Sequence, residues 1–386
     1  MIFSMRSAVK ILISALFIGG CLPVSSATPY MSSAKVDFEN GSYDKAITNY
    51  SRAIELDKRL ADAYIGRGNA YFQIAKYDES LTDFKKAVEL RPGSAEALTG
   101  RGRVYSLKGQ FDLAIQDLND AIRIDSGYSE AYYRLGRCYR LQKNPDLTMA
   151  LASYNKAIEL DGKVADYYEG LGNCLWDMEE QGRAFQAYNT MIELKGPRLV
   201  ANYENRSYRY ASINEYDRAI ADRDMAIQLR PDFAPNYNSR AWYYLMNGES
   251  EKAMLDVDKC LELDPNYSYA WSTRGEIFYA VGNINQALDD FSRSLQLGNP
   301  GTVVYYERAK CYYHKKEYSI AIVDLNKAID INAENAEAYL YRALCYKVLG
   351  QPDKAIADFQ SAANFSHDAA VIKQAMSEIE SLREAK

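Results

Sequence analysis

The chain has 386 residues, of which 48% are hydrophobic and 25% charged, and it contains 33 tyrosines but 3 tryptophans. A single compact core is near its usual upper size at this length, so several domains or a repeat array is expected. The formal net charge is −6. Because nucleic-acid binding usually requires a basic stripe, this balance argues against a nucleic-acid partner.

Residues 1–26 have the pattern of a secretory signal peptide. Arg6 and Lys10 precede a ten-residue apolar run at positions 11–20. As a helix that run is too short to span a bilayer. A basic start, a short apolar stretch and small residues afterwards are typical of a secretory signal, so we expect an exported protein.

Two cleavage sites fit this signal. Cleavage before Cys21, which follows two glycines, resembles the processing of a bacterial lipoprotein, whose cysteine is then lipidated. Cleavage after Ala27 would release an unanchored protein instead. The place of Cys21 directly after the apolar run favours a lipid anchor at Cys21. The expected location is therefore the cell envelope, on the outer membrane or in the periplasm, with a secreted form as the alternative.

From residue 27 onward the sequence repeats a unit of about 34 residues, a length typical of helical arrays. Tyr-Ile-Gly-Arg-Gly-Asn-Ala-Tyr at 64–71 returns as Leu-Thr-Gly-Arg-Gly-Arg-Val-Tyr at 98–105. The fourth and fifth repeats carry two and one extra residues, at expected turns, where added length is tolerated. In this phase the ten repeats are 27–60, 61–94, 95–128, 129–164, 165–199, 200–233, 234–267, 268–301, 302–335 and 336–369.

The spacing inside each repeat is helical. Positions 4 and 11 are aromatic or apolar around a small residue at position 8, which is Gly, Ala or Ser in all ten repeats. Positions 20, 24 and 27 follow as alanine-like, apolar and alanine-like. Such steps put each set on one face of its own helix. Each repeat is therefore predicted to be a tight antiparallel pair of helices.

Turn residues separate the two predicted helices of a repeat. Gly41 and its equivalents end the first helix, and Asp44, Asp78 and their equivalents are placed to cap the second. After the last repeat, residues 370–386 have an amphipathic pattern. We expect them to form a capping helix that shields the open end of the array.

The pattern is similar to the tetratricopeptide repeat family over nearly the whole chain beyond the signal segment. The resemblance implies an all-α fold, a right-handed α-solenoid of about ten antiparallel helix hairpins. It also implies a non-enzymatic scaffold or adaptor that binds other proteins or peptides in a concave groove.

Seven repeats carry Arg at position 7 and Asp sixteen residues later, and the three other repeats change both positions together. This joint change indicates contact, since a guanidinium beside small residues needs a carboxylate. We interpret these residues as structural pairs rather than ligand contacts. The predicted pairs are Arg67–Asp83, Arg101–Asp117, Arg206–Asp222, Arg240–Asp256, Arg274–Asp290, Arg308–Asp324 and Arg342–Asp358.

No residue cluster in the sequence indicates catalysis or a cofactor. The two histidines, His314 and His367, lie in different repeats, and no glycine-rich phosphate loop is present. Cysteines at equivalent positions of adjacent hairpins, such as Cys311 and Cys345, should lie about 8–10 Å apart, too far for a disulfide. We expect buried thiols, no metal, no cofactor and no enzyme activity.

Positions 2, 5, 6, 9, 12 and 13 of the first helix are left free by the predicted packing, and we call them the groove stripe. The resemblance implies that this stripe lines the concave groove. Aromatic, arginine and asparagine side chains gather on it in repeats three to seven, and such residues often anchor interfaces. The candidate partner-binding residues are Arg103, Tyr133, Arg134, Arg137, Arg140, Asn173, Trp176, Asn205, Tyr208 and Trp242.

Some members of the family grip the C-terminal carboxylate of heat-shock chaperones with a fixed set of basic and asparagine side chains. Asn173 and Asn205 match two positions of that set. Glu169, Pro235 and Ser239 stand where the basic residues would be needed. That clamp is therefore not expected in this chain.

Overall fold

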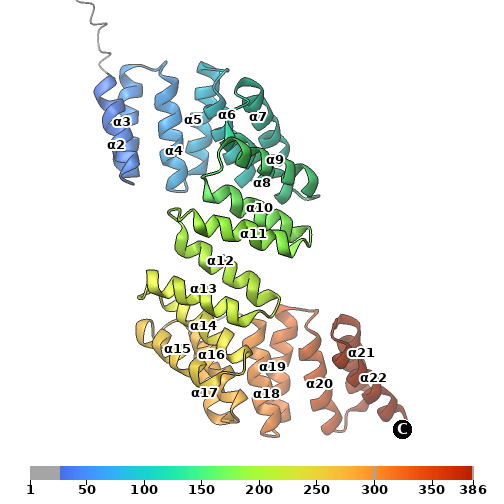
Figure 1. Ribbon diagram of the computed structural model, residues 1–386. Coiled ribbons are helices and arrows are strands. Elements are labelled where there is room, and N and C mark those ends of the chain that lie inside the picture. The colour runs from blue at the N-terminus through green and yellow to red at the C-terminus, as the bar shows by residue number, and fades with distance from the viewer. Residues whose placement is uncertain (1–26, 299–300, 385–386) are drawn as a thin grey trace, which may run out of the picture. The chain divides into compact units, whose positions relative to one another are not determined.

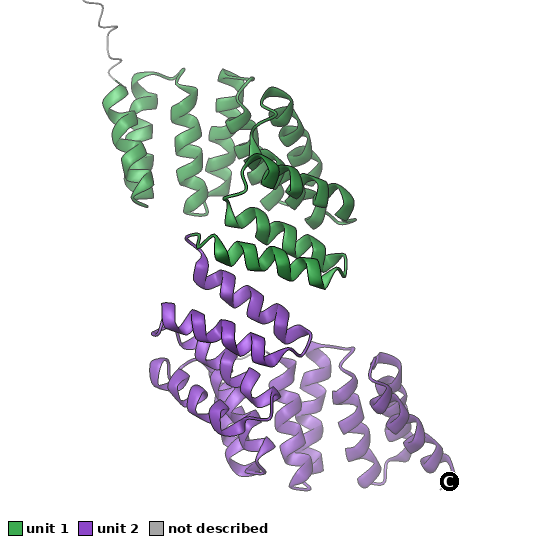
Figure 2. Cartoon of the chain, viewed as in Figure 1, with its two compact units in different colours: residues 1–196 green, residues 197–386 purple. Residues whose placement is uncertain are grey.

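The computed structural model describes residues 27–298 and 301–384, and this part of the chain consists of 21 helices, α2 to α22, joined by turns (Figure 1). The predicted signal peptide and Cys21 lie outside the described residues. The chain divides into two compact units, residues 1–196 and 197–386 (Figure 2), here called the N-terminal and C-terminal units.

Each unit is a row of helix hairpins. The N-terminal unit holds α2 (Thr28–Glu39), α3 (Tyr43–Leu56), α4 (Ala61–Gln73), α5 (Tyr77–Leu90), α6 (Ala95–Leu107), α7 (Phe111–Ile124), α8 (Ser129–Leu141), α9 (Leu147–Leu160), α10 (Ala165–Asp177) and α11 (Gln181–Glu193). The C-terminal unit holds α12 (Leu199–Ser212), α13 (Tyr216–Leu229), α14 (Ala234–Met246), α15 (Ser250–Leu263), α16 (Ser268–Ala280), α17 (Ile284–Gln296), α18 (Thr302–His314), α19 (Tyr318–Ile331), α20 (Ala336–Val348), α21 (Pro352–Phe365) and α22 (Ala369–Glu384).

Helix contacts follow the predicted pairing. The two helices of each repeat pack along each other, and within a unit the second helix packs on the first helix of the next repeat. Most successive first helices, such as α14 and α16, also touch directly. Successive second helices make no comparable contact in the described part of the chain. The first helices therefore line the side of each row on which adjacent hairpins lie closest to one another. The second helices form the outer side.

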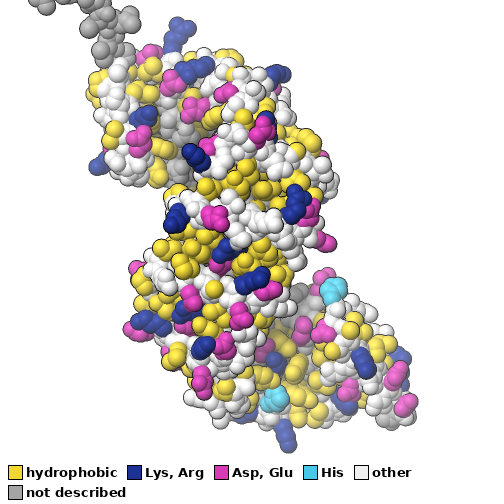
Figure 3. All heavy atoms as spheres, viewed as in Figure 1, with side chains coloured by type: hydrophobic (Ala, Val, Ile, Leu, Met, Phe, Trp, Pro, Cys, Tyr) yellow, Lys and Arg dark blue, Asp and Glu magenta, His cyan; other side chains and the backbone are white. Residues whose placement is uncertain are grey.

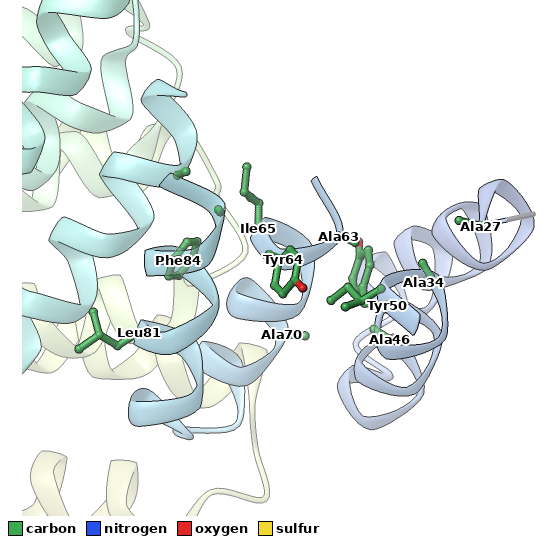
Figure 4. Close-up of a cluster of buried hydrophobic side chains, with 14 of the residues drawn as sticks. Ala27, Ala34, Ala46, Tyr50, Ala63, Tyr64, Ile65, Ala70, Leu81 and Phe84 are labelled. Carbon is green, nitrogen blue, oxygen red and sulfur yellow. The ribbon is translucent and has the colours of Figure 1, made fainter. Parts of the chain in front are cut away.

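The core repeats one packing arrangement, in which the large side chain at position 24 lies between two hairpins. Tyr50 and Phe84, both at position 24, are 6% and 0% exposed (Figure 4). A Cβ atom on Gly66 would lie 2.3 Å from the Tyr50 ring, and one on Gly100 would lie 2.2 Å from the Phe84 ring. Glycine on the neighbouring first helix is thus what makes room for these rings.

The turns differ from the prediction in one respect. Gly41 has φ of +73°, a left-handed conformation that glycine adopts without strain, and it follows the end of α2. Asp44 and Asp78, however, lie inside the first turns of α3 and α5. The residues at the cap positions are Ser42 and Lys76, whose side chains form no capping hydrogen bond. The prediction that these aspartates cap the second helices is wrong, because the cap positions lie two residues earlier in the chain.

The last helix, α22, covers the end of the C-terminal unit. Ala375 and Ile379 of α22 are 0% and 4% exposed and join a core cluster with Leu340 and Phe359. Their spacing of four residues places both side chains on one face. Within the described residues, none of the helices is both long enough and apolar enough to cross a membrane.

Candidate partner-binding groove

All seven predicted Arg–Asp pairs are ion pairs inside a single hairpin. Nε and Nη2 of each arginine donate to the two carboxylate oxygens of its aspartate at 2.5–3.0 Å. The seven aspartates are 3–7% exposed. Burial raises the pKa of Asp83 above its ordinary value, while the Arg67 guanidinium opposes the rise. These pairs hold the two helices of a hairpin together, so they do not form a binding surface.

Three of the candidate arginines lie together in the N-terminal unit. Arg103, Arg134 and Arg137 line a small depression of about 30 Å³ beside Phe72. The Arg103 guanidinium lies 3.7 Å from the centroid of the Phe72 ring. Burial, reinforced by the charge of Arg134, lowers the pKa of Arg103 to about 10. Arg134 Nε donates to Glu130 Oε1 at 2.6 Å. The side chains of this basic cluster therefore lie close together and are largely in contact with neighbouring side chains of the same unit.

Tyr133 is not part of a groove, contrary to its assignment from the sequence. It is 6% exposed, and its ring centroid lies 5.1 Å from that of Tyr167, a buried residue of the next repeat. Repeat five has Tyr167 where half of the ten repeats have alanine, and the extra ring covers Tyr133. Arg140 donates to Asp177 at 2.9 Å and remains half-buried.

The remaining candidates of the N-terminal unit also contact their own hairpin. Tyr188 donates its hydroxyl hydrogen to Asn173 Oδ1 at 2.9 Å. The half-buried Trp176 packs edge to face on Phe185, with ring centroids 5.8 Å apart. Asn205 lies in the C-terminal unit, where it is exposed on α12.

The C-terminal unit contains a pocket of about 560 Å³ that includes two predicted residues, Tyr208 and Trp242. Most of its lining comes from the groove stripe of repeats six to nine. Tyr208, Tyr269 and Val303 at its surface are 64%, 52% and 53% exposed. The residues that line this pocket are Tyr208, Ala211, Ser212, Arg223, Asn238, Ser239, Trp242, Tyr243, Tyr269, Ser272, Thr273, Glu276, Gly301, Val303 and Val304.

One wall of the pocket carries a half-buried acidic group, Glu276 of α16. Burial raises the pKa of Glu276 to about 7, and the nearby Glu307 carboxylate raises it further. Lys310, the Ser272 hydroxyl and the Trp242 indole act in the opposite direction. Glu276 is therefore poised to change charge near neutral pH.

The pocket also contains a positively charged side chain, Arg223, which was not among the groove residues predicted from the sequence. Arg223 occupies position 24 of repeat six, where we predicted an apolar residue. Its Nη1 donates to Asn236 Oδ1 at 2.7 Å, and its guanidinium lies 5.9 Å from the centroid of the Tyr243 ring. The signal was present in the sequence, because the nine other repeats have Tyr, Phe, Leu or Val at this position.

None of the described histidines and cysteines lines this pocket. In the described part of the chain no group of three or more His, Cys, Asp and Glu side chains is arranged to hold a metal ion. The five cysteines beyond Cys21 are free and buried, as expected. His314 is exposed, and its Nε2 shares a hydrogen bond with the Tyr279 hydroxyl at 2.8 Å.

Consecutive helix hairpins with small residues at their crossings define an α-solenoid of repeats. Family models for the tetratricopeptide repeat match this chain in several stretches, so it contains tetratricopeptide repeats. The matched residues are 34–74, 59–127, 129–164, 234–267, 303–335 and 325–357.

Two solved structures share this fold along almost the full length. The crystal structure of yeast Tom70 is 15% identical, with a TM-score of 0.54, and the match covers 93% of this chain and 96% of that one. The crystal structure of the APC/C hetero-tetramer Cut9–Hcn1 is 13% identical, with a TM-score of 0.51, covering 97% and 99%. At these identities the likeness shows the solenoid fold alone.

One curated protein is similar over a short stretch. It is a UDP-N-acetylglucosamine–peptide N-acetylglucosaminyltransferase of Giardia intestinalis, 33% identical over 90 residues. The match covers 23% of this chain and 6% of that protein.

Proposed function

We propose that this protein is a non-enzymatic scaffold that binds a segment of another protein in the groove of its C-terminal unit. The observation that carries the proposal is the 560 Å³ pocket on the groove stripe, with Trp242 in its wall and exposed aromatic rings at its surface. Aromatic side chains in concave sites bury much area on binding and anchor many interfaces. The tetratricopeptide repeats themselves support a scaffold rather than a catalyst.

We further propose that the scaffold works in a bacterial cell envelope, tethered by lipid at Cys21. The support is the sequence itself, in which Cys21 follows the apolar run and two glycines. A secreted, unanchored protein that binds a host or surface ligand is the alternative, and cleavage after Ala27 would produce it.

Replacing the anchor residue tests the tether. In the lipoprotein form Cys21→Ser removes the acylated side chain, so the protein should move from the membrane fraction to the soluble fraction. Ser25→Ala, which leaves Cys21 in place, is the control and should stay with the membrane. A soluble wild-type protein whose first residue is Thr28 would show that the secreted alternative is correct.

Photo-crosslinking tests the groove. A photoreactive phenylalanine analogue is placed at Tyr208 or Tyr269, which are exposed on the groove stripe, in cells that make the full-length protein. Matched positions on the outer side are Leu255 of α15 and Val323 of α19, 73% and 61% exposed. Crosslinks to partner proteins should form from the groove positions and not from the outer positions. The reverse pattern would mean that partners recognise the outer face.

A further inference from the structure

Arg223 breaks the core pattern of the array at one position. In the nine other repeats the residue at position 24 is apolar or aromatic and no more than 6% exposed. Figure 4 shows two of these residues, Tyr50 and Phe84, within one buried hydrophobic cluster of the N-terminal unit. An arginine at the same place puts a charge where the array elsewhere places a large apolar side chain.

The guanidinium of Arg223 lacks the carboxylate partner that the seven position-7 arginines have. Within the described part of the chain its hydrogen bond goes to the Asn236 amide oxygen, and its Nε is buried with no partner. The neighbouring Asp222 carboxylate is held by both Nε and Nη2 of Arg206. Arg223 as a whole is half-buried. A guanidinium partly removed from water without a counter-charge destabilises a fold, so its presence requires another explanation.

Two amide groups beside Arg223 are also incompletely bonded. Asn236 is 0% exposed, and its Nδ2 has no partner among the described residues. Asn238, which lines the pocket with Arg223, has a buried Oδ1 without a partner. Asn236 stands at position 3, which is alanine in half of the ten repeats. Polar groups have thus replaced apolar ones on two adjoining helices, α13 and α14, where Arg223 lines the pocket and Asn236 is bonded to it.

We propose that the pocket binds a partner segment that carries a carboxylate beside a large apolar side chain, with the carboxylate at Arg223 and the apolar side chain against Trp242. Charge complementarity supports this occupant, since a guanidinium pairs with a carboxylate through two parallel hydrogen bonds. The aromatic walls suit an apolar neighbour. Because the pocket already contains one acidic side chain, Glu276, a singly charged carboxylate fits better than a phosphate. The proposal rests on the groove function above and names the chemistry of its ligand.

The carboxylate can come from an Asp or Glu side chain or from a chain terminus, and two peptide libraries distinguish these sources. Full-length protein is used to select from random heptapeptides whose C-terminus is fused to the carrier, and from random heptapeptides with a free C-terminus. Enrichment of Asp or Glu next to Leu, Ile, Phe or Trp in the fused library indicates a side chain. Enrichment in the free library alone, without acidic side chains, indicates a terminus. Enrichment of Lys or Arg, or no enrichment of any peptide in either library, would overturn the proposal.

A variant that restores the ordinary core tests the role of Arg223 directly. Arg223→Leu with Asn236→Ala reproduces residues found at positions 24 and 3 of other repeats, including Leu118 and Ala97. In fluorescence anisotropy with the selected peptide, its affinity should fall about tenfold or more, since a charge-assisted pair is lost. Its urea midpoint should rise, because the unpaired polar groups are gone.

Two further variants complete the test. Arg223→Lys keeps the positive charge and should retain part of the affinity, whereas Arg218→Leu, on the same helix outside the pocket, should change nothing. Wild-type affinity in the restored-core variant would refute the carboxylate contact. In that case crosslinks from Tyr208 would still support the groove, whereas their absence would refute the groove function itself.

Discussion

Glu276 illustrates how the groove differs from an ordinary solvent-exposed helix face. Its carboxyl lies against Trp242 and Ser272, with Glu307 and Lys310 of α18 nearby, and its pKa is raised to about 7. The Lys310 ammonium, which would otherwise hold Glu276 ionised, is paired with Glu307 at 2.9 Å. Burial therefore dominates, and the neutral acid is the favoured form below neutral pH.

This raised pKa predicts a pH-dependent stability. The folded state holds the Glu276 proton more tightly than the unfolded state, whose pKa is near the ordinary 4.5. The stabilisation is present below that value and is lost as pH rises through 7. Glu276→Gln should therefore be more stable than wild type at pH 8, by about 1–3 kcal/mol, and nearly equal at pH 4.5. Urea unfolding at both pH values measures this, with the exposed Glu380→Gln as control. An equal difference at both pH values would contradict it.

The buried cysteines give a second prediction at the scale of single residues. Burial raises the pKa of the Cys311 and Cys345 thiols to about 12, which leaves little reactive thiolate near pH 8. In a Cys21→Ser protein, an aromatic disulfide reagent should label the remaining five cysteines slowly when folded and rapidly in urea. Fast labelling of the folded protein would show that these thiols are accessible.

At the scale of the helices, the Arg–Asp pairs decide how firmly each hairpin holds. Arg101 and Asp117 join α6 to α7, and their side chains are 22% and 7% exposed. Arg240 has two carboxylate partners, Asp256 at 2.6 Å and Asp224 at 2.5 Å. Removal of Asp117 therefore leaves Arg101 without a carboxylate partner, whereas removal of Asp256 leaves Arg240 paired with Asp224.

The two hairpins should respond differently to the same truncation. Asp117→Ala should destabilise its unit by about 3 kcal/mol, because Arg101 is left partly buried without a carboxylate. Asp256→Ala should lose less, since Asp224 still pairs with Arg240. The double change Arg101→Leu with Asp117→Ser, which copies Leu135 and Ser153 of repeat four, should also lose less. Urea unfolding compares them, and equal losses for the single and double changes would argue against an energetic link between the two residues.

At the scale of the whole molecule, the described helices form two compact units, and within each unit the repeats contact their neighbours in sequence. Acidic and basic side chains are mixed over the visible face of both units, without a broad area of one sign (Figure 3). This agrees with the small net charge of −6 and gives no support to a nucleic-acid surface. The free energy of unfolding of such an array is close to the sum of contributions from the single repeats and from the interfaces between neighbouring repeats.

Because stability is local, a substitution in one repeat should destabilise mainly that repeat and its neighbours. Amide hydrogen exchange in Asp117→Ala should accelerate in α6, α7 and the helices next to them, because these depend directly on the lost pair. Helices α16 and α17 in the C-terminal unit should exchange as in wild type. Acceleration spread evenly over all the described helices would instead indicate one cooperative structure.

The sequence alone determined the hairpins, their order and the contacts within them. A period of 34 residues with small side chains at fixed positions leaves one efficient way to pack two helices, and joint changes of Arg and Asp identify partners inside that packing. The buried thiols follow from the same pattern. Each of these features depends on spacing within one repeat, which the sequence records directly.

The site depended on the tertiary structure. Periodicity predicts which face of a helix is free, but the depth of a groove depends on the side chains of several helices at once. Tyr133 lies on the predicted stripe and is nevertheless buried, because Tyr167 covers it. The pocket forms in repeats six to nine, where Arg223 stands in place of the large apolar side chain that the other repeats have at position 24. The volume of such a pocket is the space that the side chains of adjoining helices leave unfilled. It therefore exists only once those helices are packed together.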